Sequence, residues 1–189
     1  GDPVVEVPRL AAEAGATAVY VIRDHGPYGR RRDAAVAATL TTGGSRLVGV
    51  GSNYAVAPGS VTKADGAPYA VFTPFRRAWQ AHGWAAPSDV PEVRWHGRDR
   101  LASLPMPAGF SAYIEPPVGE AAALARWADV LPALREYKDE RDRPDHDGTS
   151  CLSTALRWGT VHPRTLLADL QPGDPGHDTF ASELAWREF

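Results

Sequence analysis

Apolar residues change their spacing along the chain, and each spacing predicts a kind of element. Residues 17–22, TAVYVI, form an unbroken apolar run, which is typical of a strand buried on both faces. Residues 45–53, SRLVGVGSN, predict a second strand. Helical patterns closed by glycine stand at 8–16 and 30–44. Strand, helix and strand in this order predict a parallel sheet with covering helices.

The second half of the chain has a different texture. A helix with Pro74 in its first turn is predicted over 72–84, and it closes an α/β part that spans residues 1–84. Residues 85–118 are rich in proline and weakly periodic, which predicts a connector. Residues 119–189 predict only helices and turns. The expected fold class is therefore α/β followed by all-α.

Composition and charge narrow the function classes. The 189 residues carry a formal net charge of −3, which argues against a protein that coats polyanions but permits a local basic groove. No apolar run approaches the ~20 residues that span a bilayer, and the N-terminal residues are not a secretory signal. The single cysteine, Cys151, fits a reducing compartment, and the six histidines lack metal-ligand spacing. We expect a cytoplasmic monomer without metal or membrane partner.

Both ends of the pattern look incomplete. The α/β part holds too few strands for a stable open sheet, and the last predicted helix stops at Phe189 without a cap. We therefore expect the chain to be an internal fragment of a longer protein.

Candidate chemistry begins with the small residues of DGTSCLS, 147–153. Thr149 or Ser150 is a natural N-cap, and the free N–H groups at a helix start carry partial positive charge. Small side chains there would let a phosphate approach the backbone. An ordinary capped helix explains the same residues, so this segment alone leaves both interpretations open.

Two further segments combine charged and aromatic residues. Residues 135–144, REYKDERDRP, alternate in charge, which fits a solvated helix face as well as a binding surface. In ELAWREF, Glu183 and Arg187 stand four residues apart, and Trp186 follows Glu183 by three. Either a salt-bridged surface pair beside a core tryptophan or a binding face explains this spacing.

The order and spacing of these segments together resemble the flavin-binding domain of the DNA photolyase/cryptochrome family. The motifs are Y-x3-R-D-x-P, D-G-T-S-x-L-S, x-G-x-x-x-P-R and E-L-x-W-R-E-F. In the first half, GPYGRRRDAAV at 26–36 and GAPYAVFTPFRRAW at 66–79 resemble segments of the same family. The resemblance covers essentially the whole chain and is strongest to a class I cyclobutane pyrimidine dimer photolyase. It implies part of a Rossmann-like antenna-type domain, the interdomain connector and the first helices of the helical FAD-binding domain.

The resemblance also implies a reaction, a cofactor and roles for named residues. The reaction is light-dependent repair of pyrimidine dimers in damaged DNA by electron transfer from reduced FAD. The implied flavin contacts are Tyr137, Thr149, Ser150, Cys151, Leu152, Ser153 and Phe180. The implied DNA contacts are Arg141, Glu183, Trp186 and Arg187. Glu183 and Trp186 are the implied catalytic pair, because they would line the pocket that receives the flipped dimer.

Several alternatives stay open at this stage. The Asn-Glu pair that binds a folate antenna in some relatives is absent at 27–29, so an antenna chromophore stays unidentified. A cryptochrome-type blue-light photoreceptor is the alternative function, although ELAWREF favours repair, and an inert fragment without flavin is a third. The motif favours the cyclobutane dimer over the (6-4) lesion. Repair requires that the turn at 149–153 and the face at 183–186 border a common hollow.

Overall fold

The computed structural model describes residues 1–88, 91–95, 101, 105 and 117–189. Most of the predicted connector, 85–118, lies outside these described residues. The chain divides into two compact units. We call them the α/β unit, described over residues 1–52, 91–95, 101 and 105, and the helical unit, described over residues 53–88 and 117–189.

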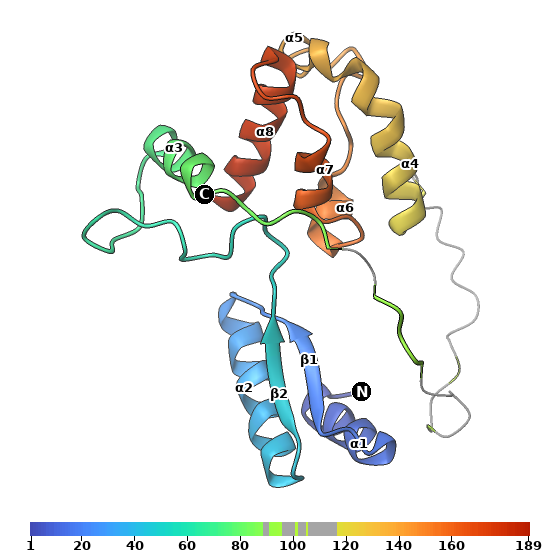
Figure 1. Ribbon diagram of the computed structural model, residues 1–189. Helices are drawn as coiled ribbons and strands as arrows, with labels where there is room; N and C mark the ends of the chain where they lie inside the picture. The colour runs from blue at the N-terminus through green and yellow to red at the C-terminus, as the bar shows by residue number, and fades with distance from the viewer. Residues whose placement is uncertain (89–90, 96–100, 102–104, 106–116) are drawn as a thin grey trace. The chain divides into compact units, whose positions relative to one another are not determined.

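The α/β unit alternates helices and strands as expected (Figure 1). Its elements are α1 (Pro3–Ala14), β1 (Ala18–Ile22), α2 (Pro27–Thr42) and β2 (Arg46–Val50). The Asp2 carboxylate caps α1 by accepting the Val4 N–H at 2.9 Å, and Gly15 ends the helix in the left-handed region at φ 62°. The two strands are parallel, with Ala18 opposite Arg46. The predicted helix-covered parallel sheet is therefore confirmed.

The expected burial of residues 17–22 on both faces is wrong for this unit. Val19 packs into a cluster with Ala11 of α1 and Leu40 of α2, which both lie against one face of the sheet. Side chains alternate between faces along a strand, and Tyr20 and Ile22 stay 65% and 52% exposed. The described helices thus cover one face, and an unbroken apolar run does not reveal how many faces are covered.

The helical unit contains the remaining elements (Figure 1). They are α3 (Phe72–His82), α4 (Glu120–Val130), the 3-10 helix η2 (Leu131–Glu136), α5 (Tyr137–Glu140), α6 (Ser153–Trp158), α7 (Pro163–Ala168) and α8 (Pro175–Glu188). Its core includes Trp79, Leu134, Leu152, Leu166 and Ala185. The prediction of only helices and turns over residues 119–189 is confirmed. Among the described residues, no helix combines the length and apolar character that crossing a membrane requires.

The change of compact unit falls at Ser52–Asn53, inside the α/β part expected over residues 1–84. α3 belongs to the helical unit because its buried side chains pack against α8. Trp79 is 1% exposed, and its indole N–H donates to Glu188 at 2.6 Å. Phe75 of α3 lies 5.3 Å from the Phe189 ring, measured between ring centroids. The domain limits of the complete protein stay a prediction.

Candidate functional site

Helix α8 carries four of the eleven predicted site residues, and its start is tightly fixed. Asp174 caps the helix by accepting the N–H groups of Gly176 and His177 at 3.0 and 3.2 Å. A Cβ on Gly176 would lie 2.1 Å from the Leu134 carbonyl oxygen. Only glycine therefore lets α8 approach η2 this closely, and this contact positions the side chains that follow.

Two predicted flavin contacts, Tyr137 and Phe180, meet edge to face. Their ring centroids lie 5.3 Å apart at 79°, and Phe180 stacks on Trp127 of α4 at 5.2 Å. Tyr137 is 9% exposed and Phe180 is 3% exposed. Burial raises the pKa of the Tyr137 phenol, the nearby Glu183 carboxylate raises it further, and the Arg141 guanidinium opposes the rise. The phenol is therefore neutral at physiological pH.

Glu183 pairs with Arg141 of the segment after α5. Arg141 Nη1 donates to Glu183 Oε1 at 2.5 Å, and the two side chains are 33% and 31% exposed. The pair brings together two residues assigned to DNA, 42 positions apart in sequence. It leaves the carboxylate partly accessible, so Glu183 can still accept hydrogen bonds from a ligand.

Arg187 does not form the helix-surface pair with Glu183 that the spacing permits. Its Nη1 and Nη2 groups donate to the carbonyls of Asn53 and Leu156, both at 2.8 Å, and its guanidinium lies 4.9 Å from the Tyr54 ring centroid. The Leu156 carbonyl lies in the last turn of α6, where carbonyls lack intrahelical donors, which explains its attraction for the guanidinium. Arg187 thus has a structural role in the helical unit, and its contact with DNA stays a prediction.

Trp186 is half exposed, and one face of its indole is covered. Its ring stacks on Phe72 of α3 with centroids 3.6 Å apart and planes 10° apart. Phe189 meets the indole edge at 5.7 Å. With 51% of its surface accessible, Trp186 has room for a further aromatic contact.

The turn at 149–153 is not the first turn of a helix. α6 begins at Ser153, and Leu152 occupies its cap position without a side-chain cap bond, so the predicted cap at Thr149 or Ser150 is wrong. Cys151 has φ 55°. Leu152 is 2% exposed, and burying it in the core pulls the chain out of helical geometry just before α6. Thr149, Cys151 and Ser153 stay exposed around that anchor.

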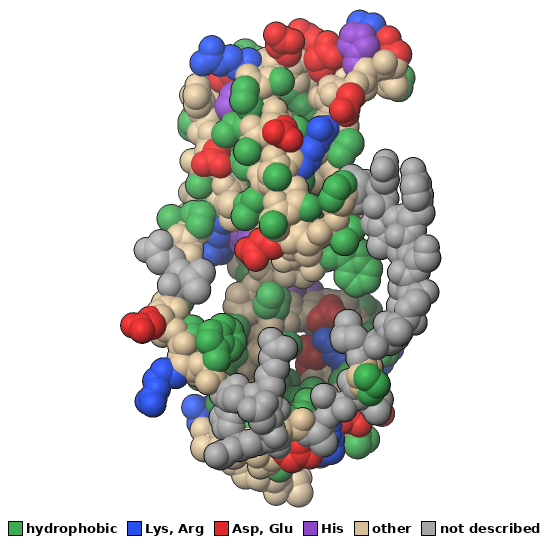
Figure 2. All heavy atoms as spheres, turned by 90° about the vertical axis from the view of Figure 1, so that its right-hand side faces the viewer, with side chains coloured by type: hydrophobic (Ala, Val, Ile, Leu, Met, Phe, Trp, Pro, Cys, Tyr) green, Lys and Arg blue, Asp and Glu red, His purple; other side chains and the backbone are tan. Residues whose placement is uncertain are grey.

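A charged surface surrounds the segment after α5. Figure 2 shows acidic, basic and histidine side chains gathered at the end of the helical unit where α5 lies. Arg143 pairs with Asp145 at 2.8 Å, and His146 Nδ1 lies 2.7 Å from Glu140 Oε2. These side chains are 31% exposed or more, so each pair adds little stability. Most of this segment is therefore a solvated face, while Arg141 turns toward α8.

Among the described residues of the helical unit, two cavities are relevant to the predicted site. The smaller, of about 220 Å³, is lined by Arg126, Asp129, Val130, Ala133, Leu134, Glu136, Tyr137, Glu140, Asp147, Gly148 and Thr149. Tyr137 and Thr149 therefore share a cavity, and their contact with a flavin stays a prediction. The four carboxylates in its wall face one guanidinium, a charge balance that disfavours a phosphate inside it.

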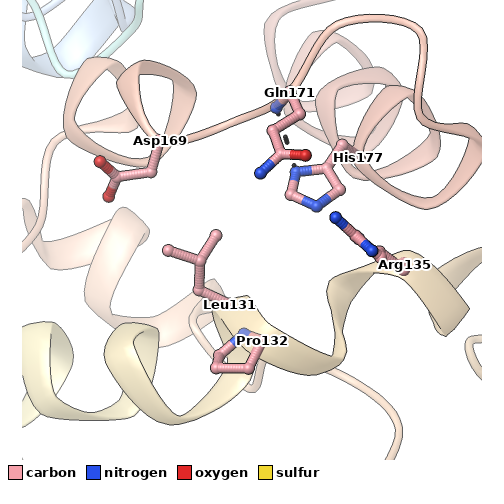
Figure 3. Close-up of a pocket in the computed structure, with 6 residues that line it drawn as sticks. All are labelled: Leu131, Pro132, Arg135, Asp169, Gln171 and His177. Carbon is pink, nitrogen blue, oxygen red and sulfur yellow. Dashed lines mark hydrogen bonds between the residues drawn. The ribbon is translucent and has the colours of Figure 1, made fainter.

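The larger cavity, of about 350 Å³, contains none of the predicted site residues (Figure 3). Its lining is Leu131, Pro132, Arg135, Asp169, Gln171 and His177. The buried His177 ring accepts the Gln171 backbone N–H through Nδ1 at 3.2 Å. Glu183 and Trp186 line neither of these two cavities. A common hollow for the turn and the acid–indole face stays a prediction.

Two residues with many contacts escaped the sequence analysis. Glu188 accepts the N–H groups of Ala55, Val56 and Trp79, and Arg126 binds the backbone just before Cys151. Their partners lie between 23 and 133 positions away. The motif E-L-x-W-R-E-F does include Glu188, but nothing local reveals its partners.

Comparison with known proteins settles the family. A DNA photolyase family model matches residues 1–93. The chain is 36% identical to an uncharacterized 31.6 kDa protein in the atpI 5'region of Synechococcus sp. (strain PCC 6716), over 100% of the chain and 72% of that protein. The chain belongs to the DNA photolyase family. The sequence resemblance is therefore confirmed.

Other members of the photolyase family extend the comparison. The chain is 32% identical to the deoxyribodipyrimidine photo-lyase of Synechococcus sp. (strain ATCC 27144 / PCC 6301 / SAUG 1402/1), over 100% of the chain but 44% of that protein. A class III photolyase from Agrobacterium tumefaciens superposes with a TM-score of 0.76 at 26% identity, over 100% of the chain and 43% of that structure. A Synechocystis sp. PCC6803 cryptochrome shares the fold. It superposes with a TM-score of 0.73 at 18% identity, over 100% of the chain and 44% of that structure.

Proposed function

We propose that the complete protein repairs cyclobutane pyrimidine dimers in DNA with light, by electron transfer from reduced FAD, as a deoxyribodipyrimidine photo-lyase. The observation that carries the proposal is the half-exposed Trp186 indole, supported on one face by Phe72, three residues after a partly accessible Glu183. An indole and a carboxylate on one helix suit a damaged base better than a protein core.

The physical demands of repair match these residues. A dimer inside a duplex must be flipped out, which costs a few kcal/mol and costs least for a damaged pair. Stacking of a base on an aromatic ring returns roughly 1–3 kcal/mol, and the open part of Trp186 can supply it. Glu183 can accept hydrogen bonds from base N–H groups, and Arg141 can bind a backbone phosphate that positions the strand.

The residues at the turn fit a flavin dinucleotide. Thr149, Cys151 and Ser153 are exposed, so hydroxyl and backbone groups of the turn are available to phosphate oxygens, while buried Leu152 holds the turn in place. Because the cavity beside Tyr137 is rich in carboxylates, we place the phosphates on the exposed side of the turn. The bound flavin would supply the electron, and the protein would supply position and exclusion of water.

Illumination of the complete, flavin-reduced protein with a dimer-containing oligonucleotide tests this function. We expect light-dependent loss of the dimer. In Trp186→Ala we expect weaker binding of the damaged oligonucleotide, by about tenfold from the lost stacking, with the flavin absorbance unchanged. Phe72→Leu is the graded variant, because it removes the ring beneath Trp186 but keeps the indole.

Two results would contradict the proposal. Flavin-loaded protein that never consumes dimers under light would indicate a photoreceptor of the same fold. Loss of flavin in Trp186→Ala would show that Trp186 lies against the cofactor instead of the lesion.

A further inference from the structure

An arginine from another helix holds the turn that precedes α6. Arg126 of α4 donates from Nε to the Ser150 carbonyl at 3.1 Å and from Nη2 to the Thr149 carbonyl at 2.8 Å. Nη2 also reaches Asp147 Oδ1 at 3.2 Å. One guanidinium therefore fixes two consecutive peptide groups and the carboxylate that precedes them.

The helix that carries Arg126 is held firmly. Its neighbours Ala123 and Trp127 on α4 are 5% and 4% exposed, and the Trp127 indole donates to Asp169 at 2.7 Å. The Arg126 side chain is 33% exposed. The rigid fork of a guanidinium matches two acceptors at once, which a lysine ammonium on its flexible stem does not.

The turn needs such a support. Within the described residues, Cys151 is the one non-glycine residue at positive φ, at 55°. A left-handed residue with a side chain persists only where the surroundings over-determine it. Arg126 fixes the backbone before Cys151, and buried Leu152 fixes it afterwards.

The contacts also set the direction of the peptide N–H groups. In a trans peptide the carbonyl and the following N–H point in opposite directions. Drawing the Thr149 and Ser150 carbonyls toward Arg126 therefore turns the N–H groups of Ser150 and Cys151 away from α4. The turn carries the exposed Cys151 side chain, so a ligand can approach it from solvent.

We propose that Arg126 is a positioning residue for the cofactor: it orients the N–H groups of Ser150 and Cys151 toward the phosphates of FAD without touching them. The proposal rests on the proposed function, because the ligand of the turn is the flavin. It predicts that the fork geometry of Arg126 matters, and that its charge alone does not suffice.

Two measurements on the complete protein separate the roles. The first is the electron paramagnetic resonance line shape of a nitroxide on Cys151, without flavin and with cysteines outside this segment replaced by serine. The second is the FAD dissociation constant from a fluorescence titration. The variants are Arg126→Lys, which keeps the charge, and Arg126→Gln, which removes it. Arg135→Gln is the matched control, since Arg135 is 68% exposed and makes one ion pair at 3.8 Å.

We expect both Arg126 variants to mobilise the nitroxide and to weaken FAD binding by about tenfold, while Arg135→Gln changes neither. Wild-type affinity in Arg126→Lys with a loss in Arg126→Gln would overturn the proposal in favour of direct charge contact. An unchanged nitroxide in both variants would overturn it as well. If the wild-type protein binds no FAD, but the Arg126 substitutions still mobilise the nitroxide, the proposed function fails. The role of Arg126 toward a cofactor then fails with it.

Discussion

The carboxylate of Glu188 joins α8 to two other parts of the helical unit, and its removal has a calculable cost. Oε1 accepts the Ala55 N–H, and Oε2 accepts the Val56 N–H at 3.1 Å and the Trp79 indole N–H at 2.6 Å. Trp79 is 1% exposed, so water cannot replace the lost acceptor.

The magnitude follows from the chemistry of each substitution. A hydrogen bond to a charged group contributes about 1.5–3 kcal/mol, and a buried donor left unpaired costs about 1–3 kcal/mol. Glu188→Gln keeps one oxygen but turns an NH₂ group toward at least one N–H donor. We expect it to lower the free energy of unfolding by about 2 kcal/mol. Glu188→Ala leaves three donors without an acceptor and should lower the free energy of unfolding by about 4 kcal/mol.

Urea denaturation followed by tryptophan fluorescence measures these differences. Glu136→Gln is the control, because Glu136 is exposed on η2, and its effect should stay within about 0.5 kcal/mol. Trp79→Phe removes the indole donor, so a double-mutant cycle with Glu188→Gln should give a coupling energy of about 1 kcal/mol. A Glu188→Gln protein as stable as the control, or a cycle without coupling, would refute the reasoning.

Two further predictions concern α8 and the tyrosine beside it. Gly176→Ala should destabilise the protein by about 1–3 kcal/mol because its Cβ would meet the Leu134 carbonyl. Thermal unfolding measures this, and a variant that is more stable than wild type, as alanine usually makes a helix, would contradict the prediction. Since burial raises the pKa of Tyr137, the folded protein keeps the phenol neutral after the unfolded chain ionises near pH ~10. The contribution of the Tyr137 phenol to the free energy of unfolding should therefore be fully present below that pH and should decrease above it. Urea midpoints at rising alkaline pH should fall less steeply in Tyr137→Phe than in wild type, and equal slopes would exclude the effect.

Sequence reasoning succeeded where local interactions decide the structure. The end of the first helix follows Gly15 as expected, because a C-cap acts within a few residues, whereas the helix starts at Pro3 behind the Asp2 cap and not at the expected residue 8. The motif order identified the family because it samples many positions at once. It also named Tyr137, Phe180, Glu183 and Arg141, which the structure brings together.

Sequence reasoning failed where a distant partner competes with a local one. Arg187 was four residues from a carboxylate, yet two carbonyls in other segments bind it. Thr149 and Ser150 have the chemistry of helix caps, but burial of Leu152 delays the helix to Ser153. In both cases long-range packing outweighs a local preference of about 1 kcal/mol or less.

The amino-acid sequence alone therefore determined the kinds of elements, their order and the family, because hydrophobic period, capping residues and motif spacing are properties of neighbouring residues. The tertiary structure alone decided that α3 joins the helical unit, that Glu183 turns to Arg141, and that Arg126 and Glu188 support the candidate site. These outcomes depend on which backbone and side-chain groups are left without partners when distant segments pack. The spacing of residues along the chain does not determine which distant segments meet.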